Sequence, residues 1–168
     1  MKNTKKLIIT RHGKTSKKYD VDDIDRPLKD RGINDSCLMA ERLYIRDIHP
    51  DLLVSSHANR AMHTAMIFAR KLNYPLEKIK IENVIYDGSA KEILEFVKSL
   101  DDSLNTIMIF GHNPMCMDMA NYFMKEEIEK LPTAGTVSLN FKTNSWKEIH
   151  KDIASTDFID YPKKRFEE

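Results

Sequence analysis

The sequence predicts an α/β protein, built as a three-layer α/β/α sandwich around a mostly parallel central sheet. Short runs of apolar and β-branched residues alternate along the chain with longer segments whose apolar residues recur at helical spacing. Gly or Pro residues interrupt the chain where these patterns change, as in residues 111–114. With 168 residues the chain fits one domain (1–168), with its core in about residues 5–150 and a tail, 155–168, that no pattern assigns.

Composition and charge exclude several classes of protein. Hydrophobic residues make up 41% of the chain and charged residues 32%, which is too apolar a composition for a disordered chain. The 27 basic and 26 acidic residues leave a net charge of +1, so bulk charge indicates neither a nucleic acid nor an anionic membrane as partner. No apolar run approaches the ~18 residues that a membrane span requires. We therefore expect a protein that binds neither nucleic acid nor membranes.

The N-terminus and the cysteines bear on the cellular compartment. The basic segment 1–6 is followed by only a short apolar run before Arg11, so an export signal is not expected. Cys37 and Cys116 lie in apolar helical patterns and lack CxxC spacing, so we expect two buried free thiols rather than a disulfide. Together these features predict a cytoplasmic protein.

The predicted strands are apolar runs that end abruptly. Four of them are expected at residues 5–10, 51–56, 79–85 and 106–110. A fifth run, 137–141, alternates apolar and polar residues as a half-buried or edge strand does. A turn at 142–145 is expected to lead into a further strand that contains Trp146 and Ile149.

The predicted helices follow these strands. The first is expected to end at Pro50 and to bury an apolar face made of Ile33, Cys37, Ala40, Tyr44 and Ile48. Helix caps are expected at Ser56, at Ser89 with Glu92 three residues later, and at Asn113 with Pro114 as the first helical residue.

Charged and titratable residues follow three of the predicted strands. The first strand leads to Arg11 and His12, the second to His57 and Arg60, and the fourth to His112. In a parallel sheet these strand ends lie at one edge, where ligands bind. The planar fork of arginine binds phosphate through two parallel hydrogen bonds, and a neutral imidazole can attack phosphorus. These residue types therefore indicate phosphoryl-transfer chemistry.

Four segments then resemble a known family. Residues 11–13, RHG, resemble the signature of the histidine phosphatase superfamily, whose fold is phosphoglycerate-mutase-like. Residues 55–65, SSHANRAMHTA, are similar to its second block, SSPxxRAxQTA, and residues 111–114, GHNP, to its third. Residues 26–28, RPL, followed by Gly32, resemble the RPLTxxG stretch of the SixA-like branch, the phosphohistidine phosphatases. The resemblance covers residues 7–141.

The resemblance implies roles for particular residues. It implies that His12 is the nucleophile and that the phosphoryl group is bound by Arg11, Arg60 and His112. By the same resemblance Arg26 is a further cation on the phosphate or substrate side, with hydrogen bonds added by Asn113 or Thr15.

Three positions depart from the family pattern. His57 replaces a proline near the rim of the pocket, where it could touch substrate. His63 replaces a glutamine one turn after Arg60 and could orient that arginine or face solvent, and Lys29 replaces a threonine.

Electrostatics should keep His12 neutral. The surrounding cations are expected to depress its pKa, and its second ring nitrogen needs an acceptor, such as the carbonyl of Gly13. No cofactor is expected. Six histidines are present, but none stands in a recognised metal-ligand pattern, and the arginines would repel a cation, so we expect no metal dependence.

The possible substrates differ in whether their leaving group needs a proton from a general acid. Release of an alkoxide requires a proton donor, and Asp87 is the one carboxylate placed to serve after the third strand. Phosphohistidine needs less help because its leaving imidazole has a pKa of about 6.5. The short chain leaves no room for insertions over the pocket. We therefore expect a phosphohistidine phosphatase acting on a protein, such as a histidine-containing phosphotransfer domain.

Two alternatives stay open. One is a phosphatase of the same superfamily that hydrolyses small phosphomonoesters, with Asp87 as general acid. The other is a non-catalytic module that binds phosphate or phosphoproteins, although the presence of both His12 and His112 speaks against it because arginines alone could bind the anion.

Overall fold

The structure, a computed structural model, describes residues 3–166 and contains one six-stranded sheet. Its strands are β1 Lys5–Arg11, β2 Leu52–Ser55, β3 Lys80–Ile81, β4 Thr106–Gly111, β5 Thr136–Phe141 and β6 Ala154–Asp160. Their order across the sheet is β3-β2-β4-β1-β5-β6. The first four strands are parallel, and β5 runs antiparallel to both β1 and β6. The sheet is therefore mostly parallel, as predicted.

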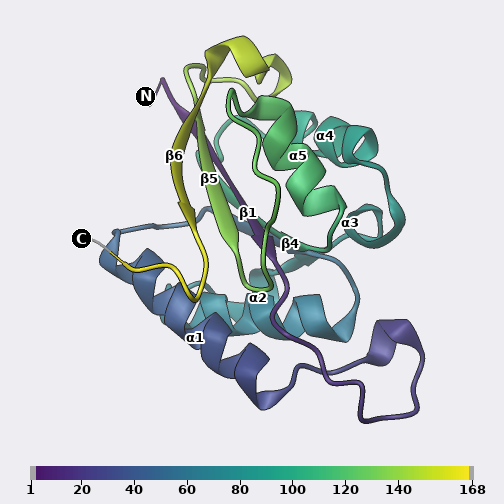
Figure 1. The fold of residues 1–168 in the computed structure, drawn as a ribbon. Coiled ribbons are helices and arrows are strands. Elements are labelled where there is room, and N and C mark those ends of the chain that lie inside the picture. The colour runs from purple at the N-terminus through teal and green to yellow at the C-terminus, as the bar shows by residue number, and fades with distance from the viewer. Residues whose placement is uncertain (1–2, 167–168) are drawn as a thin grey trace.

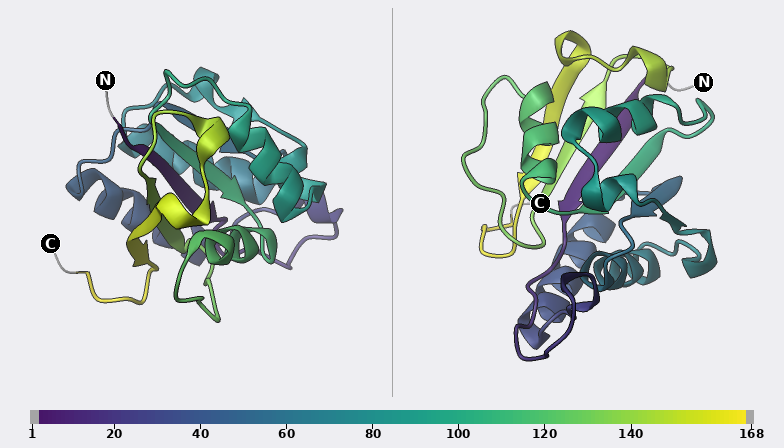
Figure 2. Two further views of the ribbon diagram at one scale, coloured as in Figure 1. Left: turned by 90° about the horizontal axis from the view of Figure 1, so that it is seen from above. Right: turned by 90° about the vertical axis from the view of Figure 1, so that its right-hand side faces the viewer.

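Helices cover both faces of the sheet (Figures 1 and 2). They are α1 Asp30–Ile45, α2 Asn59–Lys71, α3 Val84–Asp87, α4 Ala90–Lys98 and α5 Met115–Phe123. Short 3-10 turns lie at η1 Asp23–Asp25, η2 Leu76–Lys78, η3 Trp146–Glu148 and η4 Lys151–Ile153. Within residues 3–166, none of the helices is long and apolar enough to cross a membrane.

Alternate residues of β1 build the two halves of the core. Ile8 belongs to the apolar cluster under α1 and α2, together with Leu43 and Phe68. Leu7 and Ile9 belong to the cluster that α4 and α5 cover on the opposite face. Both faces of β1 are thus buried, as expected for a central strand of a parallel sheet. This arrangement confirms the predicted three-layer sandwich.

The buried face of α1 differs from the predicted one. Tyr44 is 53% exposed and Cys37 is also exposed, so the expectation of two buried thiols was wrong for Cys37. The side chains that face the sheet are those of Ser36, Met39, Ala40, Arg42 and Leu43. The reason is a close backbone contact: a Cβ atom on Gly13 would lie 2.7 Å from the carbonyl oxygen of Gly32 and 2.8 Å from Ser36 Oγ. The start of α1 is thus packed so tightly against the loop after β1 that a side chain at position 13 would not fit.

Several boundaries also differ. The predicted strand 79–85 is reduced to the two-residue β3, and residues 84–87 form one helical turn, α3, that Gly88 ends. The side chain of Ile85 in this segment is buried, but it belongs to a helical turn and not to a strand. Helix α2 begins at Asn59 with Ala58 at its cap, so Ser56 does not cap it. The capping box of Ser89 and Glu92 is confirmed.

The C-terminal half of the sheet was the least predictable part. β5 is an interior strand, because β6 pairs with its outer edge. The predicted strand around Trp146 is instead the turn η3, in which the buried indole donates a hydrogen bond to the carbonyl of Leu104 at 2.8 Å. The last strand is formed by residues 154–160, and all but its first residue lie in the tail, 155–168, that the sequence left unassigned.

The contact between the start of α1 and the loop after β1 generates a stability prediction. A Cβ atom at Gly32 would overlap the backbone of Lys14, so the Gly32→Ala variant should lose about 1–3 kcal/mol of unfolding free energy despite the better helix propensity of alanine. Urea denaturation measures this loss. Asn34→Ala, at an exposed position of the same helix, is the control. Equal stability of the two variants would contradict the prediction.

Candidate active site

His12 lies at the carboxyl end of β1 and is only 8% exposed. Its Nδ1 is 2.7 Å from the carbonyl oxygen of Gly13. Because a carbonyl can only accept, Nδ1 must carry the proton, and in the neutral ring Nε2 then carries the lone pair. The acceptor expected from the sequence is confirmed. Nε2 is therefore the atom available to act as a nucleophile.

The backbone around His12 is held on both sides. The N–H of Gly13 donates to Thr64 Oγ1 at 3.0 Å, and the Thr64 hydroxyl donates to the carbonyl of Arg60 at 2.7 Å. The carbonyl of His12 accepts from the N–H of Ala134 at 3.0 Å. These bonds connect the end of β1 to α2 on one side and to the loop before β5 on the other. The imidazole is thus fixed by a rigid frame.

His112 follows β4, the neighbour of β1 in the sheet. Its ring centroid lies 5.2 Å from that of His12. Its Nε2 is 2.7 Å from Ser56 Oγ, which also accepts from the N–H of Ala58 at 3.3 Å. Since that hydroxyl has one proton to donate, it fits a ring whose Nε2 accepts and whose Nδ1 carries the proton. Ser56, which the sequence suggested as a helix cap, instead orients His112.

Burial keeps both rings neutral. Desolvation lowers the pKa of His12 to about 4; the bond to Gly13 opposes this, and the charges of Arg60, Arg11 and Arg26 lower it further. Desolvation, followed by the proximity of His12, lowers the pKa of His112 to about 3. The cations act in the expected direction, but removal from water is the larger cause.

Arg60 is held by a residue that the sequence did not identify. Its guanidinium donates to the carboxylate of Asp23 at 2.9 Å and to the carbonyl of Asp23 at 2.6 Å. The same carboxylate accepts from the hydroxyl of Tyr86 at 2.8 Å. The hydrogen bonds from Tyr86 and Arg60 lower the pKa of Asp23 and keep it charged. Asp23 therefore accepts one hydrogen bond from each of the two terminal guanidinium nitrogens of Arg60.

Arg26 and Thr15 lie at the base of the same loop. The guanidinium of Arg26 donates to Thr15 Oγ1 and reaches the carboxylate of Asp23 at 3.4 Å. The N–H of Ser16 donates to the carbonyl of Pro27 at 2.9 Å, which closes the base of the loop. Thr15 thus positions Arg26.

Arg11 and Asn113 converge on one carbonyl oxygen. Each of the two side chains donates a hydrogen bond to the backbone carbonyl oxygen of Leu131 at 3.0 Å. The N-cap of α5 is Pro114 and the helix begins at Met115, so the predicted cap at Asn113 with Pro114 as the first helical residue was one residue too early. The side-chain oxygen of Asn113 still accepts from the N–H of Met117 at 3.3 Å. The amide of Asn113 is therefore occupied by the protein, and its place in the structure is that of a support for the site.

Four further residues singled out in the sequence differ in whether they contact the site; they are His57, Asp87, His63 and Lys29. The ring of His57 packs against Tyr86 at 5.1 Å, and Tyr86 in turn packs against His112 at 5.4 Å. Asp87 is exposed, and no contact recorded in residues 3–166 joins its side chain to the site. His63 is half-buried and makes no recorded contact with Arg60. Lys29 is exposed at the N-cap of α1.

Unpaired polar atoms gather at this site. In the described part of the chain, seven buried side-chain atoms have no hydrogen-bond partner, and four of them are Arg11 Nε, Arg26 Nε, His57 Nδ1 and His112 Nδ1. Buried polar groups are normally paired, so a cluster of unpaired nitrogens indicates a place where a ligand supplies oxygen acceptors. Residues 3–166 hold no group of three or more His, Cys, Asp or Glu side chains suited to a metal ion.

Comparison with known proteins agrees with this geometry. Residues 7–82, which contain His12, Arg26 and Arg60, match the sequence profile of the histidine phosphatase superfamily (branch 1). Over these residues the chain is thus similar to the histidine phosphatase superfamily. An uncharacterized chloroplastic protein of Arabidopsis thaliana is 29% identical over 154 residues, which cover 86% of this chain and 70% of that protein.

Solved structures of this superfamily share the fold. A protein provisionally assigned as the phosphohistidine phosphatase SixA of Nakamurella multipartitia has a TM-score of 0.84 at 18% identity, covering 96% of this chain and 98% of that one. The protein histidine phosphatase SixA in complex with tungstate has a TM-score of 0.79 at 18% identity, covering 94% and 97%. A mycobacterial glucosyl-3-phosphoglycerate phosphatase has a TM-score of 0.64 at 15% identity, covering 92% and 97%. The fold is thus SixA-like.

The buried histidines predict how stability depends on pH. Unfolded histidines bind protons below about pH 6.5, whereas folded His12 and His112 stay neutral down to about 4 and 3, so the unfolded state binds more protons in this window. Stability should fall as the pH falls from 7 to 5, by up to about 2 kcal/mol for each histidine. Urea titrations at the two pH values measure this loss.

A matched pair of variants isolates that contribution. Replacing both buried histidines, by His12→Asn and His112→Asn, should reduce the loss of stability between pH 7 and pH 5. Replacing the exposed His49 and His150 by asparagine should leave the loss unchanged. Identical pH dependence in both double variants would contradict the depressed pKa values.

Proposed function

We propose that the protein is a phosphatase that hydrolyses phosphohistidine on a protein, through a covalent phosphoryl intermediate on His12. The observation that carries this proposal is the buried neutral imidazole of His12, with its proton held on Nδ1 by Gly13. Its Nε2 lone pair lies close to the positive charges of Arg11, Arg26 and Arg60, each of which lowers the His12 pKa. A neutral nucleophile among anion-binding groups fits phosphoryl transfer.

In the first step, His12 Nε2 attacks phosphorus while the bond from phosphorus to the substrate imidazole breaks. The electron pair of that bond stays on the substrate ring nitrogen, and the substrate ring, protonated on its other nitrogen, leaves as neutral imidazole. The arginines stabilise the negative oxygens of the transferring group. His112, whose Nε2 is occupied by Ser56, can donate a hydrogen bond from Nδ1 to one of these oxygens. In the second step, water attacks the phosphorus of phospho-His12. The P–N bond breaks, and inorganic phosphate and neutral His12 are formed.

The carboxylates around the site favour a P–N bond as substrate. Asp23 is the carboxylate that touches the site residues, and its lowered pKa leaves it without a proton to donate at neutral pH. The hydroxyl of Tyr86 donates to Asp23, which raises the pKa of that phenol and makes it a weaker acid. An alkoxide leaving group needs a proton donor, whereas an imidazole needs less help because its pKa is about 6.5.

A phosphatase acting on small phosphomonoesters is the second candidate. The mycobacterial neighbour named for glucosyl-3-phosphoglycerate has the same fold, so this fold accommodates a small phosphorylated molecule in that protein. The candidate requires a proton donor such as Asp87, which is exposed. The third candidate is a non-catalytic module that binds phosphate. In such a module the buried neutral imidazoles would have no catalytic role.

Turnover of two substrates tests the proposal. We expect release of phosphate from a phosphohistidine-bearing protein to exceed release from a simple alkyl phosphate, to be unaffected by a chelator, and to fall at least about 10³-fold in the His12→Ala variant. Asp87→Asn is the control and should retain activity on phosphohistidine.

Other outcomes would redirect the assignment. Faster hydrolysis of the alkyl phosphate, lost in Asp87→Asn, would support the phosphomonoesterase. Activity that survives His12→Ala would exclude the covalent mechanism. Inhibition by the chelator would point to a metal.

The ion pair between Asp23 and Arg60 leads to a second prediction. The Asp23 carboxylate competes with a phosphoryl group for the positive charge of Arg60, so Asp23→Asn should bind inorganic phosphate about three- to tenfold more tightly. Isothermal titration calorimetry measures this affinity. Asp20→Asn, in the same loop, serves as the control. Weaker binding by Asp23→Asn would mean that Asp23 orients Arg60 for the anion.

A further inference from the structure

A cavity of about 510 Å³ adjoins the site on the side away from Asp23. Arg11 forms part of its wall, so the cavity begins at the residue next to His12. Its other walls come from the start of α1, the loop before β5 and the tail that follows β6. The loop is fixed in place because its Leu131 carbonyl accepts from the Arg11 guanidinium at 3.0 Å. The cavity is therefore a built continuation of the candidate active site.

The charged lining of this cavity is almost entirely positive. It consists of five cations and one carboxylate, namely Arg11, Lys14, Arg31, Lys130, Lys163 and Asp35. The carboxylate is already paired, since Asp35 lies 3.5 Å from Arg31. Lys14, Lys130 and Lys163 are exposed and have no ion pair recorded among residues 3–166. For a chain whose net charge is +1, this is a marked local excess of positive charge.

The segment of chain that contacts Arg60 is acidic. Residues 20–25, within the loop between β1 and α1, contain Asp20, Asp22, Asp23 and Asp25, and the carboxylate of Asp23 pairs with Arg60; the rest of the loop carries basic residues. Figure 1 shows this loop and the C-terminal tail on opposite sides of the end of β1. A second negative group on a substrate would be repelled by the aspartates of residues 20–25 and attracted to the cations of the cavity. The rim can thus orient a substrate whose phosphoryl group lies at His12.

We propose that this cavity binds acidic side chains next to the phosphorylated residue of a protein substrate. The inference rests on the proposed function, because it assumes that the phosphoryl group is bound beside His12. The lysine ammonium groups are mobile and solvated, so each contributes little, and their combined field contributes more to orientation and selectivity than to total affinity. The protein should accordingly select phosphorylated residues that have acidic neighbours.

Binding of two labelled peptides tests this selectivity. Both carry phosphoserine, whose ester is chemically stable, flanked on one side by aspartates in one peptide and by serines in the other. Fluorescence anisotropy with the His12→Ala protein, which prevents turnover, gives the two dissociation constants. At about 50 mM salt we expect the acidic peptide to bind about tenfold more tightly, and the preference to shrink at about 500 mM salt as screening increases.

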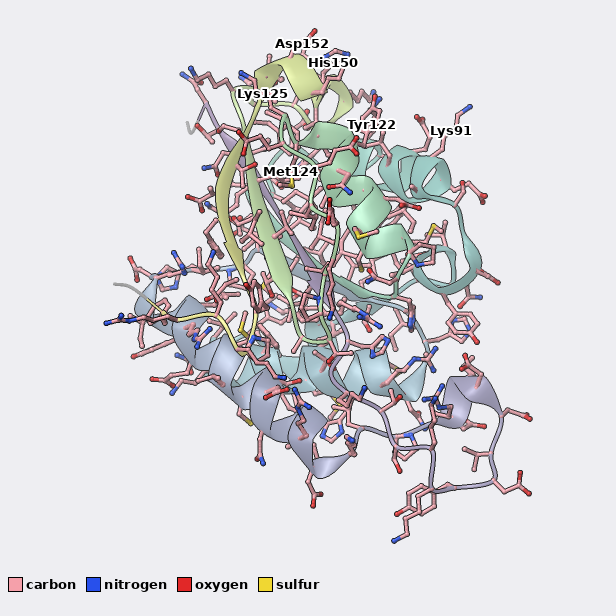
Figure 3. All side chains as sticks on the ribbon, viewed as in Figure 1. Lys91, Tyr122, Met124, Lys125, His150 and Asp152 are labelled. Atoms are coloured by element: carbon pink, nitrogen blue, oxygen red, sulfur yellow. The ribbon has the colours of Figure 1, made fainter. Side chains whose placement is uncertain are left out.

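Two triple variants with equal charge changes locate the preference. The Lys14→Gln, Lys130→Gln, Lys163→Gln variant should lose most of it. The control is Lys125→Gln, Lys147→Gln, Lys151→Gln, which should retain it. These control lysines are exposed and lie at the other end of the molecule, where Figure 3 labels Lys125, His150 and Asp152.

Each outcome decides the proposal. Equal affinity of the His12→Ala protein for the two peptides, a preference that survives high salt, or the same loss of preference in both triple variants would overturn it. The comparison needs no turnover, so its failure is separate from that of the proposed function, which is decided by phosphate release from phosphohistidine. A protein that hydrolyses phosphohistidine yet ignores acidic flanks would keep its function and lose this cavity as a recognition site.

Discussion

The hydrogen bond from the His12 ring to the carbonyl of Gly13 is the interaction on which the candidate site depends. It assigns the proton to Nδ1 and leaves Nε2 as the reactive atom. The bond has this geometry only because Gly13 is held against α2 by Thr64 and against α1 by the close approach of Gly32. The packing of two helices against the loop after β1 therefore decides the chemistry of one nitrogen atom.

The second constraint is the burial of two histidines among arginines. A charged imidazole would be costly in this environment, so the folded protein keeps both rings neutral well below neutral pH. The positive charge of the site is thus supplied by arginine, which does not lose its proton, while the proposed nucleophile is a neutral histidine. Asp23 balances part of that charge in the free protein, and a phosphoryl group would replace it.

The fold does not by itself choose the substrate. SixA proteins and a phosphatase named for glucosyl-3-phosphoglycerate share this architecture with the chain at identities of 15–18%. Around the rim of its candidate site, this chain has an acidic segment, residues 20–25, beside Arg60 on one side and a lysine-rich cavity beside Arg11 on the other. We regard this asymmetry as the feature most able to specify a partner.

Residue types and their order were enough to predict the strands β1, β2, β4 and β5, both layers of helices and the placing of His12, Arg60 and His112 at one edge of the sheet, but not β6. They sufficed because apolar periodicity reports burial, and because parallel strands bring their carboxyl ends to one edge. The acceptor for His12 was predictable as well, since Gly13 is its neighbour in the chain. By contrast, the path of the loop that brings Asp23 to Arg60 and Tyr86, residues 37 and 63 positions away, leaves no local pattern. The same holds for the buried face of α1, the pairing of Ser56 with His112 and the cavity closed by the tail after β6. Local chemistry along the chain determined which groups react, and only long-range packing decided which groups hold, balance and surround them.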